Sequence, residues 1–156
     1  MSAFLTSTSP LKPGDAVAAL ILTPDGRYLL QLRDDIPEIF FPGHWALFGG
    51  GIEPGETDRQ AVAREVMEEI GILIEEERFQ FFTNFTFDFS FAGCPPNLKR
   101  VFFEVTLTDD ELARAVLGEG AAMEAFTGEQ ALGQLKLTPY DSFALWMHFA
   151  RSRIVC

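Results

Sequence analysis

A glycine-rich segment followed by a helix signal is the feature that most limits how this chain can fold. Four glycines fall between Gly49 and Gly55. The next stretch predicts a helix from Asp58 to Ile70, because Thr57 and Gln60 have the spacing of a capping box and Gly71 suits a left-handed C-terminal cap. Glycine lets the backbone approach a ligand closely, so this loop and helix N-terminus are suited to present main-chain groups to a phosphate or a metal ion.

Three glutamates of the predicted helix share one face. Glu65, Glu68 and Glu69 stand at offsets where Cβ atoms lie roughly 5–6 Å apart. At an effective dielectric of about 20, two carboxylates about 6 Å apart repel by on the order of 3 kcal/mol, so the cluster is costly unless a cation sits in it. Oxygen ligands of this kind suit Mg²⁺, Mn²⁺ or Ca²⁺. The helix is expected to face the core with a separate apolar stripe, formed by Ala61, Val62, Val66 and Ile70.

The run from Gly50 to Ile72 resembles the Nudix box, G-x5-E-x7-R-E-U-x-E-E-x-G-U, in which U is a bulky aliphatic residue. This chain supplies all of the fixed positions, which are Gly50, Glu56, Arg64, Glu65, Val66, Glu68, Glu69, Gly71 and Ile72. One departure is Phe48, where many members have Pro before the paired glycines. The resemblance implies the Nudix fold, an α/β (α+β) architecture. In that fold an α/β/α sandwich contains a central mixed β-sheet, and the box forms a loop–helix–loop.

The resemblance also implies an enzyme, a metal-dependent hydrolase that cleaves the diphosphate linkage of a nucleoside diphosphate derivative with Mg²⁺ or Mn²⁺. Carried over by position, the metal ligands would be Glu65, Glu68, Glu69 and the Gly50 carbonyl, with one glutamate working instead as the base that activates water. Arg64 would orient the carboxylates, and Glu56 would tie the loop to the helix. A cation also fits an acidic chain of net charge −11, because it reverses the sign of the field that a diphosphate meets.

Nudix enzymes often take an extra catalytic glutamate from a region outside the box. Glu119 and Glu124 both fall in the corresponding part of this chain. Glu119 is favoured because Gly118 and Gly120 flank it and allow the loop to bend toward the metal.

Four residues outside the box are candidates for binding substrate. Arg33 ends a predicted strand, and Lys99 and Arg100 begin another, so each is placed to meet phosphate. His44 precedes the glycine-rich segment and is a candidate for the pocket. An exposed residue at a strand end explains Arg33 equally well.

The remaining hydrophobic patterns predict a hairpin of 16–22 and 28–33, a strand over 79–91 paired with 99–107, a short helix ending at Leu117, and a C-terminal helix over 139–154. Odd-numbered phenylalanines between Phe79 and Phe91 predict one aromatic face, expected in the core, with nucleobase stacking as the alternative. In the C-terminal helix, Phe143, Trp146 and either Phe149 or Ala150 are expected to form the buried stripe. His148 is expected at the surface or its boundary, and not as a ligand.

Length and composition predict one domain, 14–156, preceded by a tether, 1–13, with 156 residues and 47% hydrophobic content. No run of 18 apolar residues predicts a membrane span, and no secretory signal is evident. The two cysteines, Cys94 and Cys156, form no metal-ligand spacing, so we expect a reducing cytoplasm. The acidic balance argues against binding of nucleic acid, and the sixteen phenylalanines are compatible with a homodimer.

Two other functions stay open at this point. One is a catalytically silent Nudix module that binds a nucleotide without cleaving it, although such modules usually have gaps in the box. The other is a diphosphate isomerase of the same fold, which would need a catalytic cysteine, and Cys94 in a Pro-rich turn is a poor candidate. The partner expected is a small nucleotide-type molecule, with nucleoside triphosphates, sugar nucleotides, dinucleoside polyphosphates and coenzymes all left open.

Overall fold

A computed structural model describes residues 10–156, so most of the expected tether lies outside the described residues. The strands are β1 (Ala16–Leu22), β2 (Tyr28–Leu32), β3 (Trp45–Ala46), β4 (Phe48–Gly51), β5 (Gln80–Phe87), β6 (Leu98–Thr106) and β7 (Ala122–Phe126). The helices are α2 (Asp58–Ile70), α3 (Asp109–Arg114), α4 (Gly128–Gln134) and α5 (Pro139–Phe149), with short 3-10 turns at Glu76–Arg78, Ser90–Ala92 and Arg151–Arg153.

The strands form a mixed sheet with β1 near its middle. Strand order is β3-β2-β1-β6-β5, and β4 and β7 add to β1 and β2 respectively. β1 and β6 run parallel, with Val17 opposite Val101, whereas β1 pairs antiparallel with β2 and β4. The sheet therefore agrees with the mixed sheet predicted from the sequence.

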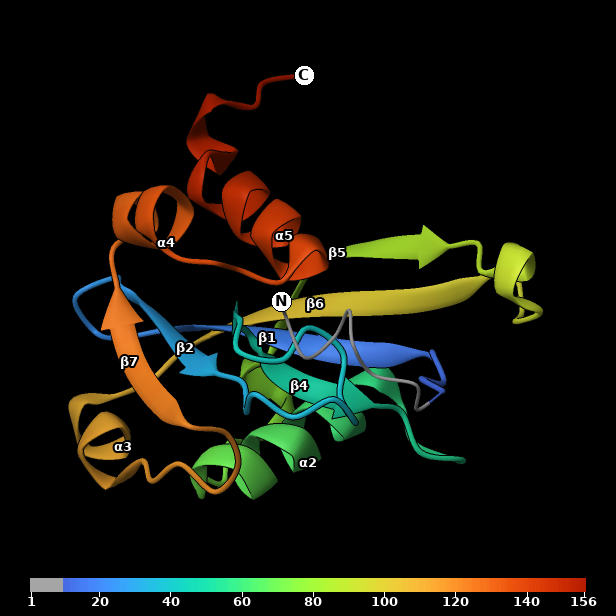
Figure 1. Ribbon diagram of the computed structural model, residues 1–156. Coiled ribbons are helices and arrows are strands. Elements are labelled where there is room, and N and C mark those ends of the chain that lie inside the picture. The colour runs from blue at the N-terminus through green and yellow to red at the C-terminus, as the bar shows by residue number, and fades with distance from the viewer. Residues whose placement is uncertain (1–9) are drawn as a thin grey trace.

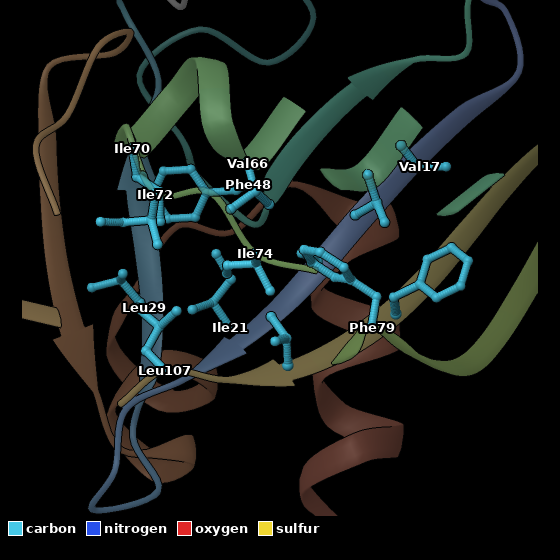
Figure 2. Packing of buried hydrophobic residues seen from close by; sticks show 14 of the residues in the cluster. Val17, Ile21, Leu29, Phe48, Val66, Ile70, Ile72, Ile74, Phe79 and Leu107 are labelled. Atoms are coloured by element: carbon cyan, nitrogen blue, oxygen red, sulfur yellow. The ribbon is translucent and has the colours of Figure 1, made fainter. Parts of the chain in front are cut away.

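Helices cover both faces of this sheet (Figure 1). One face packs against α2 and α3 in a cluster that includes Val17, Phe48 and Val66. The other face packs against α4 and α5 in a cluster that includes Leu30, Phe102 and Leu145. Figure 2 shows Phe48, Val66 and Ile70 gathered beside Ile72 in the first cluster. The α/β/α sandwich is confirmed.

The box helix forms as its sequence predicts. α2 runs from Asp58 to Ile70. The Thr57 hydroxyl accepts from the Gln60 backbone N–H, and the Gln60 side-chain oxygen accepts from the Thr57 backbone N–H. Gly71 closes the helix in the left-handed region at φ 70°. The four apolar positions expected in the core are fully buried, namely Ala61, Val62, Val66 and Ile70.

The phenylalanine strand does not have the single aromatic face that we expected. A register shift between Phe81 and Thr83 places one extra residue in β5 opposite β6. Before the shift, Phe81 lies opposite Phe103, whose side chain belongs to the core cluster that packs against α2. After the shift, Phe85 packs on Phe102, which belongs to the core cluster that packs against α5. A bulge reverses the face of the sheet on which the following residues lie, so the phenylalanines of residues 79–91 are divided between the two faces of the sheet.

The C-terminal helix differs from expectation in its end and in its buried face. α5 ends at Phe149, and a separate 3-10 turn follows. The aromatic residues expected in the core are exposed, at 54% for Phe143 and 51% for Trp146, while Asp141 and His148 are buried. Aromatic spacing alone therefore gave the wrong face, because the buried polar groups of α5 find partners on the sheet.

Residues 10–156 contain no helix with the length and apolar character of a membrane span.

Candidate active site

A cavity of about 780 Å³ opens beside β4 and the box helix. Its lining combines the three glycines of β4 with two distinct sets of side chains. The first, which we name the acidic set, is Glu65, Glu69 and Glu119. The second, the aromatic set, is Phe40, Phe41, Phe87, Phe89 and Tyr140. Phe87 and Phe89 belong to the odd-numbered phenylalanines of residues 79–91, so part of that set lines a cavity instead of packing in the core.

Glu69 is the most enclosed member of the acidic set, with 5% of its surface exposed. Gln31 Nε2 donates to its Oε1 at 3.0 Å, and the Gly49 backbone N–H donates to its Oε2 at 2.8 Å. Burial raises the pKa of Glu69 to about 7, and the Glu65 and Glu119 carboxylates add to this rise while the two hydrogen bonds oppose it. The carboxylate is thus oriented by two donors in a site that penalises its negative charge.

Glu65 lies against the backbone of β4. A Cβ atom at Gly50 would stand 2.6 Å from the Glu65 Cδ, so only glycine permits this approach. The Oε1 atom of Glu65 accepts from Arg64 Nη1 at 2.8 Å. Burial raises the pKa of Glu65, partly offset by Arg64.

The third box glutamate points elsewhere. Glu68 has a side chain that is 56% exposed, pairs with Arg64 at 3.4 Å and is absent from the cavity lining. The structure therefore brings Glu65 and Glu69 together with Glu119, instead of assembling the three box glutamates as the helical spacing predicted. Across residues 10–156, no group of three or more Asp, Glu, His or Cys side chains is already arranged around a common metal position.

Arg64 links the loop before α2 to the helix itself. Its guanidinium binds Glu56 through two nitrogens, Nε at 2.6 Å and Nη2 at 3.0 Å, and Nη2 also donates to the Gly51 carbonyl at 2.9 Å. These contacts are the ones that the expected supporting roles of Arg64 and Glu56 require. They also lower the pKa of Glu56, chiefly through the bond to Arg64.

Backbone hydrogen bonds hold the loop that carries Glu119 against the end of α2. The Gly118 N–H donates to the Glu69 carbonyl at 2.7 Å, and the Ala121 N–H donates to the Leu32 carbonyl at 2.8 Å. A Cβ at Gly118 would lie 2.8 Å from the Glu68 carbonyl, so glycine is needed for the contact. Glu124, the other candidate, is exposed on β7 and does not line the cavity.

The basic candidates line the cavity but already have partners. Arg33 Nε donates to the Phe40 carbonyl at 2.8 Å, and its other two nitrogens make no hydrogen bond within residues 10–156. Lys99 pairs with Asp58 at 3.1 Å, and Arg100 pairs with the buried Asp141 at 3.0 Å.

Arg100 also lies over the Tyr140 ring, 4.4 Å from its centroid. His44, in contrast, does not line the cavity and has its Nδ1 2.9 Å from the Pro42 carbonyl. Our assignment of His44 to the pocket is therefore not supported by its position.

Three features of the lining were not predicted as site residues. Gln31 is 4% exposed within a strand of apolar residues, and an amide at such a position is a signal that it has a specific partner. Tyr140 had no signal, because it begins a helix whose buried face was misassigned. Lys12 and Pro13 line the cavity although we had placed them in the tether.

The cavity, the box and the sandwich fold together define a family. The family model that describes the NUDIX domain matches residues 12–146 of this chain. This chain belongs to the Nudix family, as its sequence motif indicated.

Similarity to individual proteins agrees with this assignment. A stretch of 52 residues is 50% identical to the nucleoside triphosphatase NudI of Escherichia coli, and it spans 33% of this chain and only 36% of that relative. The MutT protein of Methanosarcina mazei Go1 has a similar structure, with a TM-score of 0.71 and 26% identity over 94% of this chain and 100% of that one. The E. coli ORF135 protein is similar too, with a TM-score of 0.67 and 27% identity over 95% of this chain and 100% of that one.

Proposed function

We propose that this chain is a metal-dependent hydrolase that cleaves the diphosphate linkage of a nucleoside diphosphate derivative. One observation carries the proposal: a single cavity joins the acidic set to the aromatic set. A nucleotide has the matching division into an anionic diphosphate and a flat base. Membership of the Nudix family and the name of the relative NudI, a nucleoside triphosphatase, support the same class of reaction.

The donor chemistry of the acidic set fits Mg²⁺ or Mn²⁺. Glu65, Glu69 and Glu119 line one cavity, so a dication bound there would offset the mutual repulsion of their carboxylates. Glu65 and Glu69 would hold the ion together with the Gly50 carbonyl, and Glu68 would join after a change of its side-chain rotamer. When bound, a divalent ion would neutralise phosphate charge and lower the pKa of a bound water.

The chain's own residues would supply orientation and proton transfer. Arg64 holds Glu65 and the Gly51 carbonyl, so it fixes the loop against the helix. Glu119 enters the same cavity from a loop outside the box, and it or one of the box glutamates would take the proton of the attacking water. Arg33 would contact phosphate through the two nitrogens that its bond to Phe40 leaves available.

The aromatic set would receive the base of the substrate. Aromatic side chains stack on flat rings in offset or edge-to-face geometry, which tolerates different bases. Lys99 and Arg100 are weaker candidates for phosphate than their sequence positions suggested, because Asp58 and Asp141 already neutralise them. Arg100 would instead support Tyr140 by packing over the face of its ring.

A substrate panel with two matched variants tests the function. Nucleoside triphosphates, sugar nucleotides, dinucleoside polyphosphates and coenzymes are incubated with Mg²⁺ or Mn²⁺, and phosphate is read out after phosphatase coupling. We expect Glu69→Gln to lower turnover by about 10²-fold or more, in line with the loss of a proton-transfer or ligand group, with the fold retained. Glu124→Gln, an exposed neighbour on β7, should keep wild-type turnover.

Three outcomes would contradict the proposal. Full activity in Glu69→Gln would remove the acidic set from the chemistry. Binding of nucleotides without turnover across the whole panel would instead identify a silent binding module. A product with the same mass as the substrate would indicate isomerisation, although neither cysteine lines the cavity.

We further propose that the protein acts in a reducing cytoplasm and forms a homodimer through the outer edge of β5. Both cysteines are free, as a reducing compartment requires. Within the described residues, β6 is the only strand that pairs with β5. Residues 79–87 carry no charge in a chain of net charge −11, so two copies meet least repulsion there. Exposed Phe81 lies in β5. Exposed Phe143 packs on Phe85 of β5 and stacks on exposed Trp146.

Sedimentation velocity of Thr86→Glu tests the dimer. Thr86 lies opposite Lys99 in β6, so the new carboxylate is tolerated within one chain but adds negative charge to the edge. The sedimenting mass of the wild-type protein should be twice the 17.4 kDa of one chain. Thr86→Glu should sediment with the mass of one chain. Gln134→Glu, the same charge change on α4, should remain dimeric. A monomeric wild type, or equal dimerisation by all three proteins, would rule out this surface.

A further inference from the structure

Gln31 occupies a position that no motif assigns. It lies on β2, outside the Nudix box, with 4% of its surface exposed. Its neighbours in the strand, Leu29 and Leu30, are buried apolar residues that belong to the two core clusters. A primary amide in such surroundings is costly unless its hydrogen bonds are made, so its partners identify what it does.

Those partners connect three separate parts of the cavity. Nε2 donates to Glu69 Oε1 at 3.0 Å and weakly to the Leu47 carbonyl at 3.4 Å. On its other side, Oε1 would stand 3.1 Å from a Cβ placed at Gly120, so the amide packs against the loop that carries Glu119. Gln31 therefore lies between the box helix and the loop that carries Glu119.

The bond from Gln31 leaves room for a further ligand on Glu69. Each carboxylate oxygen has two acceptor sites, and in Glu69 each oxygen accepts one hydrogen bond, from Gln31 or from the Gly49 N–H. One site on each oxygen thus stays available. The amide is also neutral, so unlike Lys or Arg it orients the carboxylate without competing with a cation for its charge.

We propose that Gln31 is a positioning residue, which holds the Glu69 carboxylate in the orientation that divalent-cation binding and hydrolysis require. This inference rests on the proposed function, because it gives Gln31 a task in that site. Residues that orient metal ligands in this way typically change metal affinity or activity by about 10–100-fold when they are replaced. The metal specified is Mg²⁺ or its spectroscopic substitute Mn²⁺.

The test uses Gln31→Met, which keeps the length of the side chain and removes the donor. Electron paramagnetic resonance of free Mn²⁺ measures affinity without any substrate or turnover. We expect Gln31→Met to weaken Mn²⁺ binding about 10–100-fold. On a substrate found in the panel, kcat should fall by a similar factor while KM changes little, since Gln31 bonds Glu69 and the aromatic set would still hold the base of the substrate.

A control separates this role from a structural one. Thr23→Val removes a different buried polar group, a hydroxyl whose partners Arg27 and Asp25 lie in the turn after β1. It should lower the thermal midpoint and leave Mn²⁺ affinity at the wild-type value. If Gln31→Met fails to fold, Gln31→Ser gives the same answer, because its shorter side chain cannot reach Glu69 and water can fill the space.

The outcomes distinguish the two proposals. Wild-type Mn²⁺ affinity and kcat in a folded Gln31→Met or Gln31→Ser would overturn the role of Gln31 and leave the hydrolase intact. Absence of Mn²⁺ binding and turnover in the wild-type protein would overturn both. A loss of affinity in Thr23→Val equal to that in Gln31→Met would mean that general destabilisation, and not positioning, explains the effect.

Discussion

The box helix α2 and the C-terminal helix α5 were both predicted from the sequence, yet only α2 formed with the buried face that we predicted. In α2, the capping hydroxyl of Thr57 bonds the helix backbone, and the apolar stripe is the buried stripe. In α5, Thr138 stands at the N-cap but makes no capping bond; its hydroxyl donates to Asp141 instead. The N-cap hydroxyl of α2 thus bonds the helix backbone, whereas that of α5 bonds the side chain of Asp141, which in turn binds groups of the sheet.

Buried polar groups explain why α5 turns its aromatic residues outward. Asp141 accepts from the Leu47 N–H at 3.1 Å and from Arg100 at 3.0 Å. His148 is fully buried between the Tyr28 hydroxyl, 2.8 Å from its Nδ1, and the Glu104 carboxylate at its Nε2. Facing the sheet with Asp141 and His148 leaves Phe143 and Trp146 on the outer side. Hydrophobic periodicity predicts a buried face only when polar residues on the other face have no partner in the core.

The largest effect that tests this comparison is expected from Asp141→Ala. The substitution leaves Arg100, which is 16% exposed, without its partner and the Leu47 N–H without an acceptor. Breaking a buried pair in this way costs about 3–5 kcal/mol, which guanidinium denaturation would measure. Asp109→Ala, an exposed acid in the first turn of α3, should cost less than about 1 kcal/mol. Equal losses in the two variants would mean that the α5 network does not hold the helix in place.

The short helix α3 offers an intermediate case, because it has a capping box and an ion pair with a distant arginine. Arg78 binds Glu111 and lowers its pKa to about 2, from an ordinary value of 4.5. A depressed pKa stabilises the fold above pH 4.5 and loses that contribution as pH falls from 4.5 to 2. We expect wild type to lose about 1–2 kcal/mol more than Glu111→Gln over this range, a value reduced for the partial exposure of Arg78. Parallel pH dependence of the two proteins, followed by urea denaturation, would remove Glu111 as the source.

The parts of the fold that sequence alone predicted are those set by neighbours along the chain. The bounds of β1 and α2 agree with the structure because a turn sequence and a capping box act over a few residues. The bulge after Phe81 was not visible, since it depends on how β5 pairs with β6. The same holds for α5, whose partners lie 94 residues away at Leu47 and 120 residues away at Tyr28.

The candidate site likewise has features that the sequence predicted and features that it did not. The motif predicted Arg64 with Glu56, and the glycine flanks predicted that Glu119 would reach the cavity. It did not predict that Glu68 would turn outward or that Gln31 would bind Glu69. Helical spacing fixes only Cβ positions, while the direction of a long carboxylate depends on donors contributed by other elements.

A smaller effect should come from the cap of α2. Thr57→Ala removes the hydroxyl that accepts from the Gln60 N–H, and we expect a loss of about 1 kcal/mol in the free energy of unfolding. Thr57→Ser keeps the acceptor and should remain close to wild type. Thermal denaturation of the three proteins measures the difference. If Thr57→Ala cost nothing, tertiary packing and not the cap would define the start of α2, and the contrast with α5 would disappear.

The smallest effect is expected where the sequence pattern was most misleading. Trp146 is 51% exposed and stacks on Phe143, which is equally open to solvent. Trp146→Ser should therefore change the free energy of unfolding by less than about 0.5 kcal/mol, measured by denaturation at a dilution where the protein is monomeric. Leu145→Ala, one residue earlier and fully buried, should cost about 2–5 kcal/mol. A loss in Trp146→Ser as large as that in Leu145→Ala would mean that the aromatic stripe contributes to the core after all, and that α5 follows the same rule as α2.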